Sequence, residues 1–316
     1  MRAAVQQGNS SNLWAGRVTP RPFWAGASED TPTFSTELKM VGILANVRDK
    51  KGHLINDLSQ DDFTVLEDGR PQAIRYFAKQ SDLPLVIGLM VDTSMSQQRV
   101  VEPERTACFH FLDQVLRENK DKIFIAQFDM NVDVRQEMTS SWKDLSAALS
   151  EVDTPSRRQL RNQMGGGTLL YDALLTGAKL MEQEHGRKAL LVLTDGVDTG
   201  SEADLNAALD ATVRADTLIY SILFSDEGYY GAFGGGGGRK VLEHLAKDSG
   251  GGFFAVSKKL TIDQVFDVIQ DELRSQYAFG YVSDKPVRIS EFRKIEVKTQ
   301  PKDLIVQARD RYWARP

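Results

Sequence analysis

Residues 83–96 read LPLVIGLMVDTSMS, and this stretch of the sequence decides the fold. Its apolar part is almost continuous and lacks the alternation of polar and apolar residues that marks a strand with one exposed face. Continuous apolar runs of this kind are typical of strands in parallel sheets, which helices cover on both faces. The run ends directly at Asp92, so the polar residues after it lie where such a strand stops.

The same pattern recurs along the chain, with helical segments between the apolar runs. Further apolar runs lie at residues 123–128, 189–193, 218–224 and 253–256. Helical segments are predicted at residues 104–116, 145–152, 169–184, 202–214, 240–247 and 262–275. Strands that alternate with helices predict an α/β domain with a doubly wound, mostly parallel sheet over about residues 82–275.

Short alternating runs flank this domain on both sides. Residues 63–66 and 72–77 are joined through Asp68-Gly69, a dipeptide typical of a tight hairpin. Residues 277–282, 292–299 and 304–308 have the same strand-like character. Because neither set could stand alone, we expect the two sets to pair. Together they would form a small β-sandwich into which the α/β domain is inserted.

The predicted organisation therefore has four segments. Residues 1–34 mix Gly, Ser, Asn and Pro without periodicity and are predicted to be a poorly ordered leader. Residues 35–81 and 276–316 are the two parts of the β-sandwich, and residues 82–275 are the α/β domain. No secretion signal is visible in the leader, because polar residues interrupt the place where its apolar core would lie.

The composition limits the classes of function. With 316 residues, 41% of them hydrophobic, and a formal charge of −5, the chain is globular and mildly acidic. Nucleic acid is therefore not expected as a partner, since a phosphate backbone calls for a clearly basic face. No window approaches the roughly 20 apolar residues of a membrane-spanning helix, so we expect no membrane span.

Histidine and cysteine give no sign of a catalytic or zinc site. His53, His110, His185 and His244 lie far apart in the sequence and lack the spacing of metal ligands. Cys108 is the single cysteine and lies beside Phe109 on the apolar face of a predicted helix. We therefore expect surface or helix-end positions for the histidines and a buried, unreactive thiol.

Oxygen-bearing residues follow two of the predicted strands and precede one of the predicted helices. The first strand leads into D-x-S-x-S, the third into T-D-G, and G-G-G-T at residues 165–168 precedes a helix. Open α/β sheets bind ligands at the carboxyl ends of their strands, so these elements are expected to meet at one edge. Carboxylate and hydroxyl oxygens suit a hard divalent cation such as Mg²⁺. The candidate metal ligands are Asp92, Ser94, Ser96, Thr168 and Asp195.

Each element also has an ordinary structural explanation. Asp92 and Ser96 are residue types that cap helices, and the glycines at 165–167 are typical of a turn. Their joint occurrence, in order and at the ends of the appropriate elements, favours a metal site over three unrelated features.

With these elements the chain resembles the von Willebrand factor type A (VWA) domain, and the three loops resemble its metal-ion-dependent adhesion site (MIDAS). The similarity is greatest to bacterial VWFA-related proteins, known mainly from acidobacteria, and covers about residues 36–316. It extends to Leu170-Tyr171-Asp172-Ala173-Leu174, Gly186-Arg187-Lys188 and Ser275-Gln276-Tyr277. The resemblance implies a sheet with one antiparallel edge strand, for which residues 133–138 are the candidate.

The resemblance also implies a function. Type A domains of this kind are non-enzymatic adhesion modules that bind an Asp or Glu of a protein partner through Mg²⁺, with Mn²⁺ or Ca²⁺ as alternatives. Mg²⁺ bound directly by Asp92 and Asp195 is formally neutral. If one aspartate binds through a water and neutral Thr168 takes its place, the site regains positive charge and attracts an acidic side chain. The relatives are generally exported, which implies a periplasmic or extracellular location.

Two other functions fit parts of the pattern. A phosphotransferase of the haloacid-dehalogenase type also carries Asp after its first strand, binds Mg²⁺ and has a later pair such as Asp195 and Asp198. Its chemistry needs a second carboxylate two residues after the nucleophile, where this chain has Ser94. The remaining alternative is a structural subunit whose metal only stabilises the loops.

An aromatic and glycine-rich stretch follows the apolar run at 218–224. Tyr229, Tyr230 and Phe233 precede the glycines at 234–238. A flexible tether is one explanation of this composition. The other is a mobile aromatic rim for a partner, because Tyr and Phe are enriched at interfaces. The three aromatic residues are therefore the candidate ligand contacts.

Overall fold

The central sheet has six strands, one of them antiparallel. The computed structural model describes residues 40–79, 83–155, 167–224, 236–285 and 287–316, and the predicted leader lies outside them. The strand order is β10 (Phe253–Ala255), β9 (Thr217–Leu223), β8 (Arg187–Thr194), β5 (Leu85–Asp92), β6 (Lys122–Phe128) and β7 (Val132–Thr139). All neighbouring pairs are parallel except β6 and β7. The predicted antiparallel edge strand is therefore confirmed.

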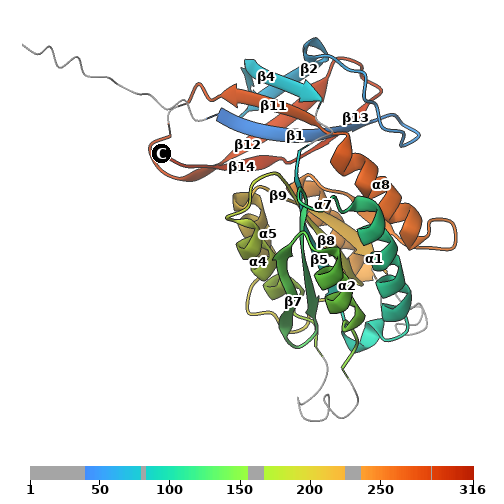
Figure 1. Cartoon of the computed structure of the whole chain (residues 1–316). Coiled ribbons are helices and arrows are strands. Elements are labelled where there is room, and N and C mark those ends of the chain that lie inside the picture. Colours follow the sequence, from blue (N-terminus) through green and yellow to red (C-terminus); the bar gives the residue numbers. More distant parts are fainter. Residues whose placement is uncertain (1–39, 80–82, 156–166, 225–235, 286) are drawn as a thin grey trace, which may run out of the picture. The chain divides into compact units, whose positions relative to one another are not determined.

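Helices cover both faces of this sheet (Figure 1). One hydrophobic cluster joins the sheet to α1 (Val101–Val115), α2 (Trp142–Ser150) and α8 (Ile262–Arg274). A second cluster joins its other face to α4 (Leu170–Met181), α5 (Leu205–Arg214) and α7 (Gly236–Ser249). Every residue of β5 and β8 is buried. This double coverage explains why their sequences show no alternation.

Two four-stranded antiparallel sheets are built from strands on either side of the α/β region. The first has the order β13 (Ile305–Ala308), β1 (Met40–Arg48), β11 (Tyr277–Val282) and β4 (Ile74–Lys79). The second has the order β14 (Arg311–Ala314), β12 (Glu291–Thr299), β2 (Phe63–Glu67) and β3 (Arg70–Gln72). Both sheets contribute side chains to one hydrophobic cluster. Strands far apart in the sequence therefore pair, as predicted.

The predicted hairpin is correct only in its first half. Asp68 and Gly69 both have positive φ, 48° and 79°, and connect β2 to β3 as a tight turn. Residues 72–77 do not form one strand, because β3 ends at Gln72 and β4 begins at Ile74 in the other sheet. The chain changes sheets there so that Ile74 and Phe77 pack on the shared cluster.

Helix boundaries differ from the predictions where caps or close packing decide them. Helix α5 begins at Leu205 rather than residue 202, because the Asp204 side chain accepts a hydrogen bond from the backbone of Ala207. Helix α7 begins at Gly236, four residues before its predicted start, so glycines 236–238 are helical. Two short 3₁₀ turns, Gln60–Asp62 (η1) and Met95–Gln97 (η2), complete the regular elements described.

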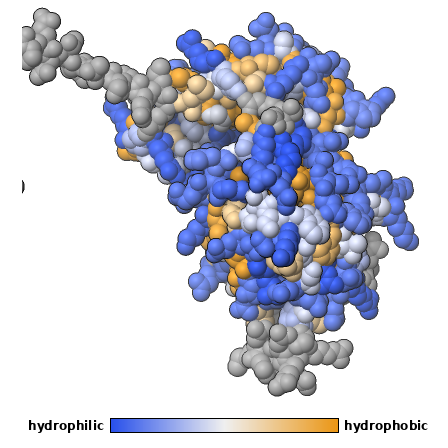
Figure 2. Space-filling view, viewed as in Figure 1, coloured by the Kyte–Doolittle hydropathy of each residue, from blue (hydrophilic) through white to orange (hydrophobic). Residues whose placement is uncertain are grey.

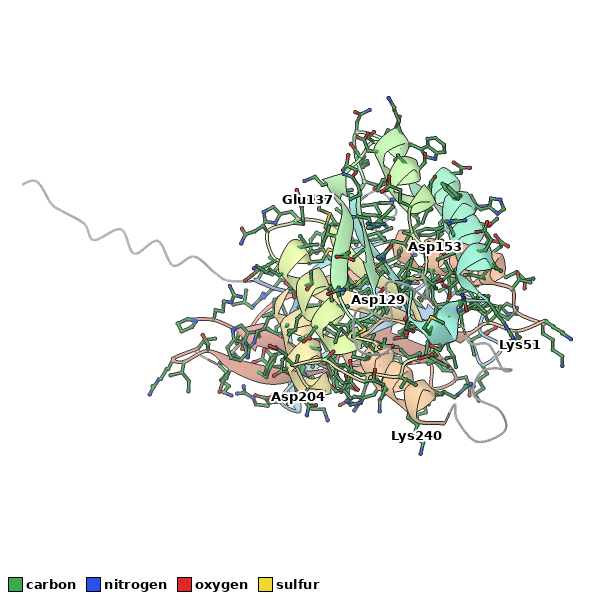
Figure 3. All side chains as sticks on the ribbon, turned by 90° about the horizontal axis from the view of Figure 1, so that it is seen from below. Lys51, Asp129, Glu137, Asp153, Asp204 and Lys240 are labelled. Carbon is green, nitrogen blue, oxygen red and sulfur yellow. The ribbon has the colours of Figure 1, made fainter. Side chains whose placement is uncertain are left out.

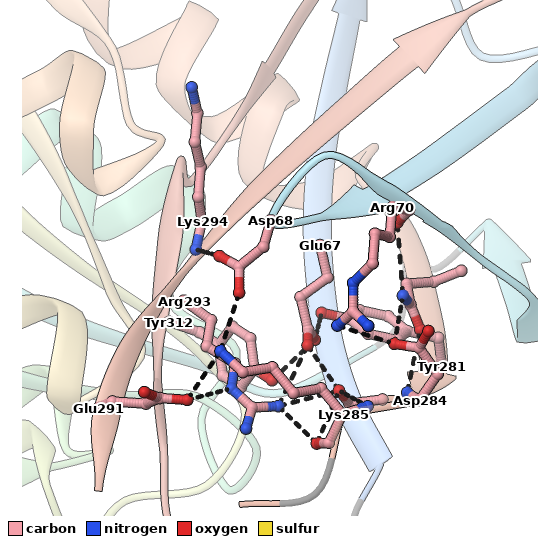
Figure 4. Close-up of polar contacts among 12 residues, drawn as sticks. Glu67, Asp68, Arg70, Tyr281, Asp284, Lys285, Glu291, Arg293, Lys294 and Tyr312 are labelled. Atoms are coloured by element: carbon pink, nitrogen blue, oxygen red, sulfur yellow. Dashed lines mark hydrogen bonds and ion pairs between the residues drawn. The ribbon is translucent and has the colours of Figure 1, made fainter.

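A buried polar network lies inside the paired sheets (Figure 4). Arg293 and Glu67 form an ion pair with N···O 3.1 Å, and both side chains are 0% exposed. The hydroxyls of Tyr281 and Tyr312 donate to the other oxygen of Glu67 at 2.8 and 2.9 Å. Hydrogen bonding on all sides offsets the cost of removing these charges from water.

The surface carries scattered apolar side chains. Figure 2 shows one face, on which hydrophilic residues predominate and hydrophobic atoms lie between them. Among the residues that the structure describes, the large exposed hydrophobic side chains lie on different elements and loops, namely Met40, Tyr76, Val134, Trp142, Ile289 and Ile305. Within the described residues no helix is both long and apolar enough to cross a bilayer.

Candidate metal centre

Two of the predicted ligand loops leave neighbouring strands at the same edge of the sheet. Asp92 is the last residue of β5, and Asp195 follows β8, which pairs in parallel with β5. The turn η2 begins at Met95, so the chain folds back immediately after β5. This turn places Ser94 and Ser96 beside the two strand ends.

Hydrogen bonds join four of the five predicted ligands into one buried network. The Ser96 hydroxyl donates to Oδ2 of Asp195 at 2.6 Å, and the Ser94 and Ser96 hydroxyls lie 3.1 Å apart. The backbone N–H of Ser94 donates to Oδ1 of Asp92 at 2.9 Å. All four residues are buried. The structure thus brings these predicted residues together.

Asp92 is the most enclosed member of the network. It has no exposed surface, and its second oxygen accepts a 2.6 Å hydrogen bond from the Thr194 hydroxyl. Burial, and next the negative charge of Asp195, raise the pKa of Asp92 from 3.8 to about 7. The two nearby carboxylates therefore form a site that is short of positive charge.

Thr168 reaches the same edge through a different set of contacts. Its backbone N–H donates to the Thr199 hydroxyl at 2.9 Å, and its carbonyl accepts from the N–H of Thr199 at 3.0 Å. The adjacent N–H of Leu169 donates to the carbonyl of Asp129 at 2.9 Å. Thr168 is buried.

Asp129 connects the loop of Thr168 to the loop of Asp92. Its Oδ2 accepts a hydrogen bond from the Thr93 hydroxyl at 3.2 Å, while its carbonyl holds Leu169. In Figure 3, seen from below the view of Figure 1, Asp129 lies near the centre. The sequence prediction missed this residue, although it directly follows the apolar run at 123–128 as Asp92 and Asp195 follow theirs.

Gln97 and Thr194 were also missed. The Gln97 side-chain amide donates to Oδ2 of Asp195 at 2.9 Å, and the Thr194 hydroxyl donates to Asp92. Both side chains are fully buried. Thr194 is the first residue of the T-D-G element, but its hydroxyl was not among the predicted ligands. Gln97 belongs to no ligand motif, and its position directly after Ser96 is the one signal that could have found it.

Helix α7 packs directly on the loop of Asp195. A Cβ added at Gly238 would lie 2.9 Å from the carbonyl carbon of Gly196 and nearer still to the carbonyl oxygen of Asp195. Gly196 itself has φ +80°. These two glycines let the helix backbone approach the loop backbone closely.

The donor set fits a hard divalent cation. It offers two carboxylates and three hydroxyls, all from buried residues, and these oxygens are the ligand types that Mg²⁺ and Ca²⁺ take. Among the described residues, no three His, Cys, Asp or Glu side chains gather in a group that could hold an ion. Any metal here would therefore depend on the hydroxyls as well as the carboxylates, which is unlike a typical zinc site.

Several predicted residues lie elsewhere. Gly165, Gly166 and the candidate ligand contacts Tyr229, Tyr230 and Phe233 lie outside the described residues. Cys108 is buried, and burial raises the pKa of its thiol well above the usual value, as expected of an unreactive cysteine. The ring nitrogens of three histidines, His53, His110 and His244, face nearby aspartates on the surface.

Asp198 has a structural role in the loop after β8. Its Oδ1 accepts a 2.5 Å hydrogen bond from the Ser201 hydroxyl and a 3.3 Å bond from the backbone N–H of Tyr171. It therefore ties this loop to the start of helix α4.

Comparison with known proteins assigns the family. The von Willebrand factor type A domain matches residues 87–268. No curated protein matches the chain. Similar solved structures include a von Willebrand factor type A protein from Catenulispora acidiphila, with 12% identity, TM-score 0.49, and coverage of 80% of this chain and 73% of that chain.

Two further structures have similar scores. BatB from Bacteroides thetaiotaomicron has 16% identity and TM-score 0.44, with coverage of 60% of this chain and 97% of that chain. The other is proximal thread matrix protein 1 from the mussel byssus, with a zinc-occupied MIDAS motif. It has 16% identity and TM-score 0.47, with coverage of 67% of this chain and 50% of that chain. Because the family match spans more than half of its length, the chain belongs to the von Willebrand factor type A domain family.

Proposed function

We propose that this chain is a non-enzymatic protein-binding module that engages an acidic side chain of its partner through a divalent metal. One observation carries the proposal, namely the buried network that joins Asp92, Ser94, Ser96 and Asp195 at the strand ends. Hydroxyls and carboxylates gathered in this way are poorly explained by helix capping alone. Family membership supports the proposal, because type A domains mediate protein–protein interactions.

The residues that would hold the metal are the intact MIDAS set of Asp92, Ser94, Ser96, Thr168 and Asp195. Mg²⁺ suits their hard oxygens best, with Mn²⁺ or Ca²⁺ as alternatives. The bound cation would supply positive charge and a coordination position for a carboxylate of the partner.

The surrounding residues determine how much positive charge the site presents. With both aspartates as direct ligands, a divalent ion is formally neutral and attracts a third carboxylate weakly. Hydrogen bonds already occupy oxygens of both side chains, from Thr194 to Asp92 and from Ser96 and Gln97 to Asp195. These bonds favour an arrangement in which hydroxyls, including that of Thr168, take more of the coordination and the site attracts an acidic side chain.

The domain organisation and location belong to the same proposal. The type A domain would comprise residues 82–275, inserted into a β-sandwich of residues 35–81 and 276–316, as in the bacterial VWFA-related proteins known mainly from acidobacteria. Pairing of β1 with β11 and of β2 with β12 supports this arrangement. An adhesion role implies that the chain acts outside the cytoplasm, in the periplasm or beyond the cell.

The phosphotransferase alternative lacks one requirement, and its second later aspartate has a structural role. Position 94, where that chemistry needs an acid or base, is a serine whose hydroxyl lies 3.1 Å from that of Ser96. Asp198, the second member of the later aspartate pair, accepts hydrogen bonds from Ser201 and from Tyr171. Both observations favour binding over phosphoryl transfer.

A pull-down with the immobilised chain tests the proposal. Extracts of the source cells are passed over wild type in Mg²⁺ and in chelator, with Asp133→Ala as a control for loss of an exposed aspartate on β7. We expect partner capture that chelator and Asp92→Ala both abolish. Thr168→Ala should weaken partner capture more than metal binding.

An Asp→Asn and Glu→Gln scan of the captured partner then tests the acidic contact. One such exchange should eliminate binding. A partner indifferent to every exchange and to chelator would contradict binding through the metal. Metal binding without any metal-dependent partner would instead favour a structural role for the ion.

A further inference from the structure

Glu104 is a buried acid outside the set of predicted metal ligands. It lies on helix α1 and is 0% exposed. Neither of its carboxylate oxygens has a hydrogen-bond partner among the described residues. A buried polar group without a partner costs about 1–3 kcal/mol, and more when it is charged, so it calls for an explanation.

The position of Glu104 relates it to the metal centre. Its backbone N–H donates to the carbonyl of Val100, whose own N–H donates to the carbonyl of Gln97 in the turn that follows Ser96. Glu104 therefore lies in the first turns of the helix that the D-x-S-x-S loop leads into. Burial, and then the charges of Asp92 and Asp195, raise its pKa well above the usual value. Its electrostatic neighbours are thus the two metal-site aspartates.

Packing alone does not explain an acid at this position. Ala107, Cys108 and Phe111, which follow it on the buried face of α1, belong to the hydrophobic cluster beneath the sheet. A leucine or methionine would suit such a face, whereas Glu104 brings two hydrogen-bond acceptors into it. By contrast, Glu102 on the same helix is exposed and forms an ion pair with Arg105.

The groups that surround Glu104 electrostatically do not donate hydrogen bonds to its carboxylate. Asp92 and Asp195 are acceptors. In the turn before α1, the Oε1 of Gln97 is a further buried acceptor that has no donor among the described residues. Oxygens of this kind need a donor that the protein side chains do not provide, namely water or a cation with its water. Within the described part of the chain, Glu104 also forms no group with two other acidic, histidine or cysteine residues that could hold an ion directly.

We propose that Glu104 is a positioning residue of the metal centre, which accepts hydrogen bonds from water between helix α1 and the ligand oxygens and so strengthens cation binding. The inference rests on the proposed function, because it assumes that Asp92 and Asp195 hold a metal. In other metal sites, residues that hydrogen-bond to the ligands without contacting the metal contribute about 10–100-fold to metal affinity.

Substitution of Glu104 in the full chain tests the inference. Glu104→Gln keeps the shape and removes the carboxylate, and Glu104→Met removes both acceptors at similar length. Glu102→Gln is the matched control, since it removes an exposed acid from the same helix. Titration calorimetry with Mn²⁺ and Mg²⁺ measures affinity, and thermal unfolding in chelator and in excess metal measures stability.

The expected pattern separates a role toward the metal from a role in folding. Both Glu104 variants should bind metal about 10–100-fold more weakly than wild type. In chelator their melting temperature should equal or exceed that of wild type, because the substitutions remove a buried carboxylate that has no hydrogen-bond partner and so destabilises the fold. Their stabilisation by a fixed metal concentration should be smaller than that of wild type. Glu102→Gln should match wild type in all three measurements.

Three results would overturn the inference, and they separate its failure from failure of the proposed function. If wild type binds metal and both Glu104 variants bind it within twofold as tightly, Glu104 has no role toward the cation and the proposed function stands. A loss of melting temperature that is equal with and without metal leads to the same conclusion. If wild type binds no divalent metal, the proposed function fails together with the inference.

Discussion

The contact between helix α7 and the Asp195 loop can be tested with two neighbouring glycines. A Cβ at Gly238 would lie 2.9 Å from the carbonyl carbon of Gly196, 3.1 Å from that of Asp195, and closer still to the Asp195 oxygen. A Cβ at Gly237 would have nothing within 4 Å. Gly238→Ala and Gly237→Ala therefore make the same chemical change in the same helical turn with different consequences.

The two substitutions should change the free energy of unfolding in opposite directions. In an open helical position, Gly→Ala stabilises by roughly 0.5–1 kcal/mol, which we expect for Gly237→Ala. At Gly238 the obstacles are backbone atoms, which cannot rotate away, so the helix or the Asp195 loop must shift. Overpacking of this kind costs about 1–3 kcal/mol. The two variants should thus differ by about 1.5–4 kcal/mol in the free energy of unfolding.

Chemical denaturation and metal titration provide the readouts. Gly238→Ala should be less stable than wild type and should bind Mg²⁺ more weakly, because the loop that carries Asp195 is displaced. Gly237→Ala should be slightly more stable and should keep the affinity of wild type. Equal stability and equal metal affinity in the two variants would refute the close packing of α7 on this loop.

Three further predictions concern pH, the buried ion pair and the paired sheets. In chelator, stability should fall as pH rises from about 4 to 7, because the native pKa of Asp92, about 7, exceeds its ordinary value of 3.8 and the native state holds the extra proton. Asp92→Asn should flatten this slope in denaturation curves, and an unchanged slope would contradict it. Glu67→Ala should lose about 3–5 kcal/mol in urea unfolding, since Arg293 stays buried without its partner, whereas the pair Glu67→Leu with Arg293→Met should recover most of that loss. A chain ending at Ser275 lacks β11–β14 and should aggregate or unfold in its front strands by size-exclusion chromatography and circular dichroism; a folded, stable monomer would contradict the shared sheets.

The α/β fold could be predicted because its strands are buried on both faces. The continuous apolar runs of β5 and β8 have no other simple explanation, and the burial of every residue in them agrees with that interpretation. Asp92 and Asp195 could be found because they directly follow those runs. In both cases the information is local in sequence, so pattern and position are sufficient.

The hydrogen-bond partners of Asp92 and Asp195 could not be predicted, because they depend on contacts between segments far apart in the sequence. Gln97 has no distinguishing spacing, yet its side-chain amide donates to Asp195. Thr194 lies in the T-D-G element beside Asp195, yet its hydroxyl donates to Asp92 on the neighbouring strand. Glu104 is two residues from exposed Glu102, and the sequence alone gives no reason to bury one and not the other.

At the glycines 236–238, a tertiary contact also decides the structure against the local sequence. Low helix propensity favoured a flexible tether, but the structure continues helix α7 through them. Close approach to the Asp195 loop requires a residue without a Cβ at 238, and this tertiary requirement overrides the propensity.

Calorimetric titration of the full chain with Mg²⁺ tests the central claim most directly, with Mn²⁺ as a second ion. Wild type and Asp133→Ala should each bind one equivalent of metal. Asp92→Ala and Asp195→Ala should bind none, with far-UV spectra that stay near native. Metal binding of unchanged affinity in both aspartate variants, or no binding in wild type, would contradict a metal centre at this edge of the sheet.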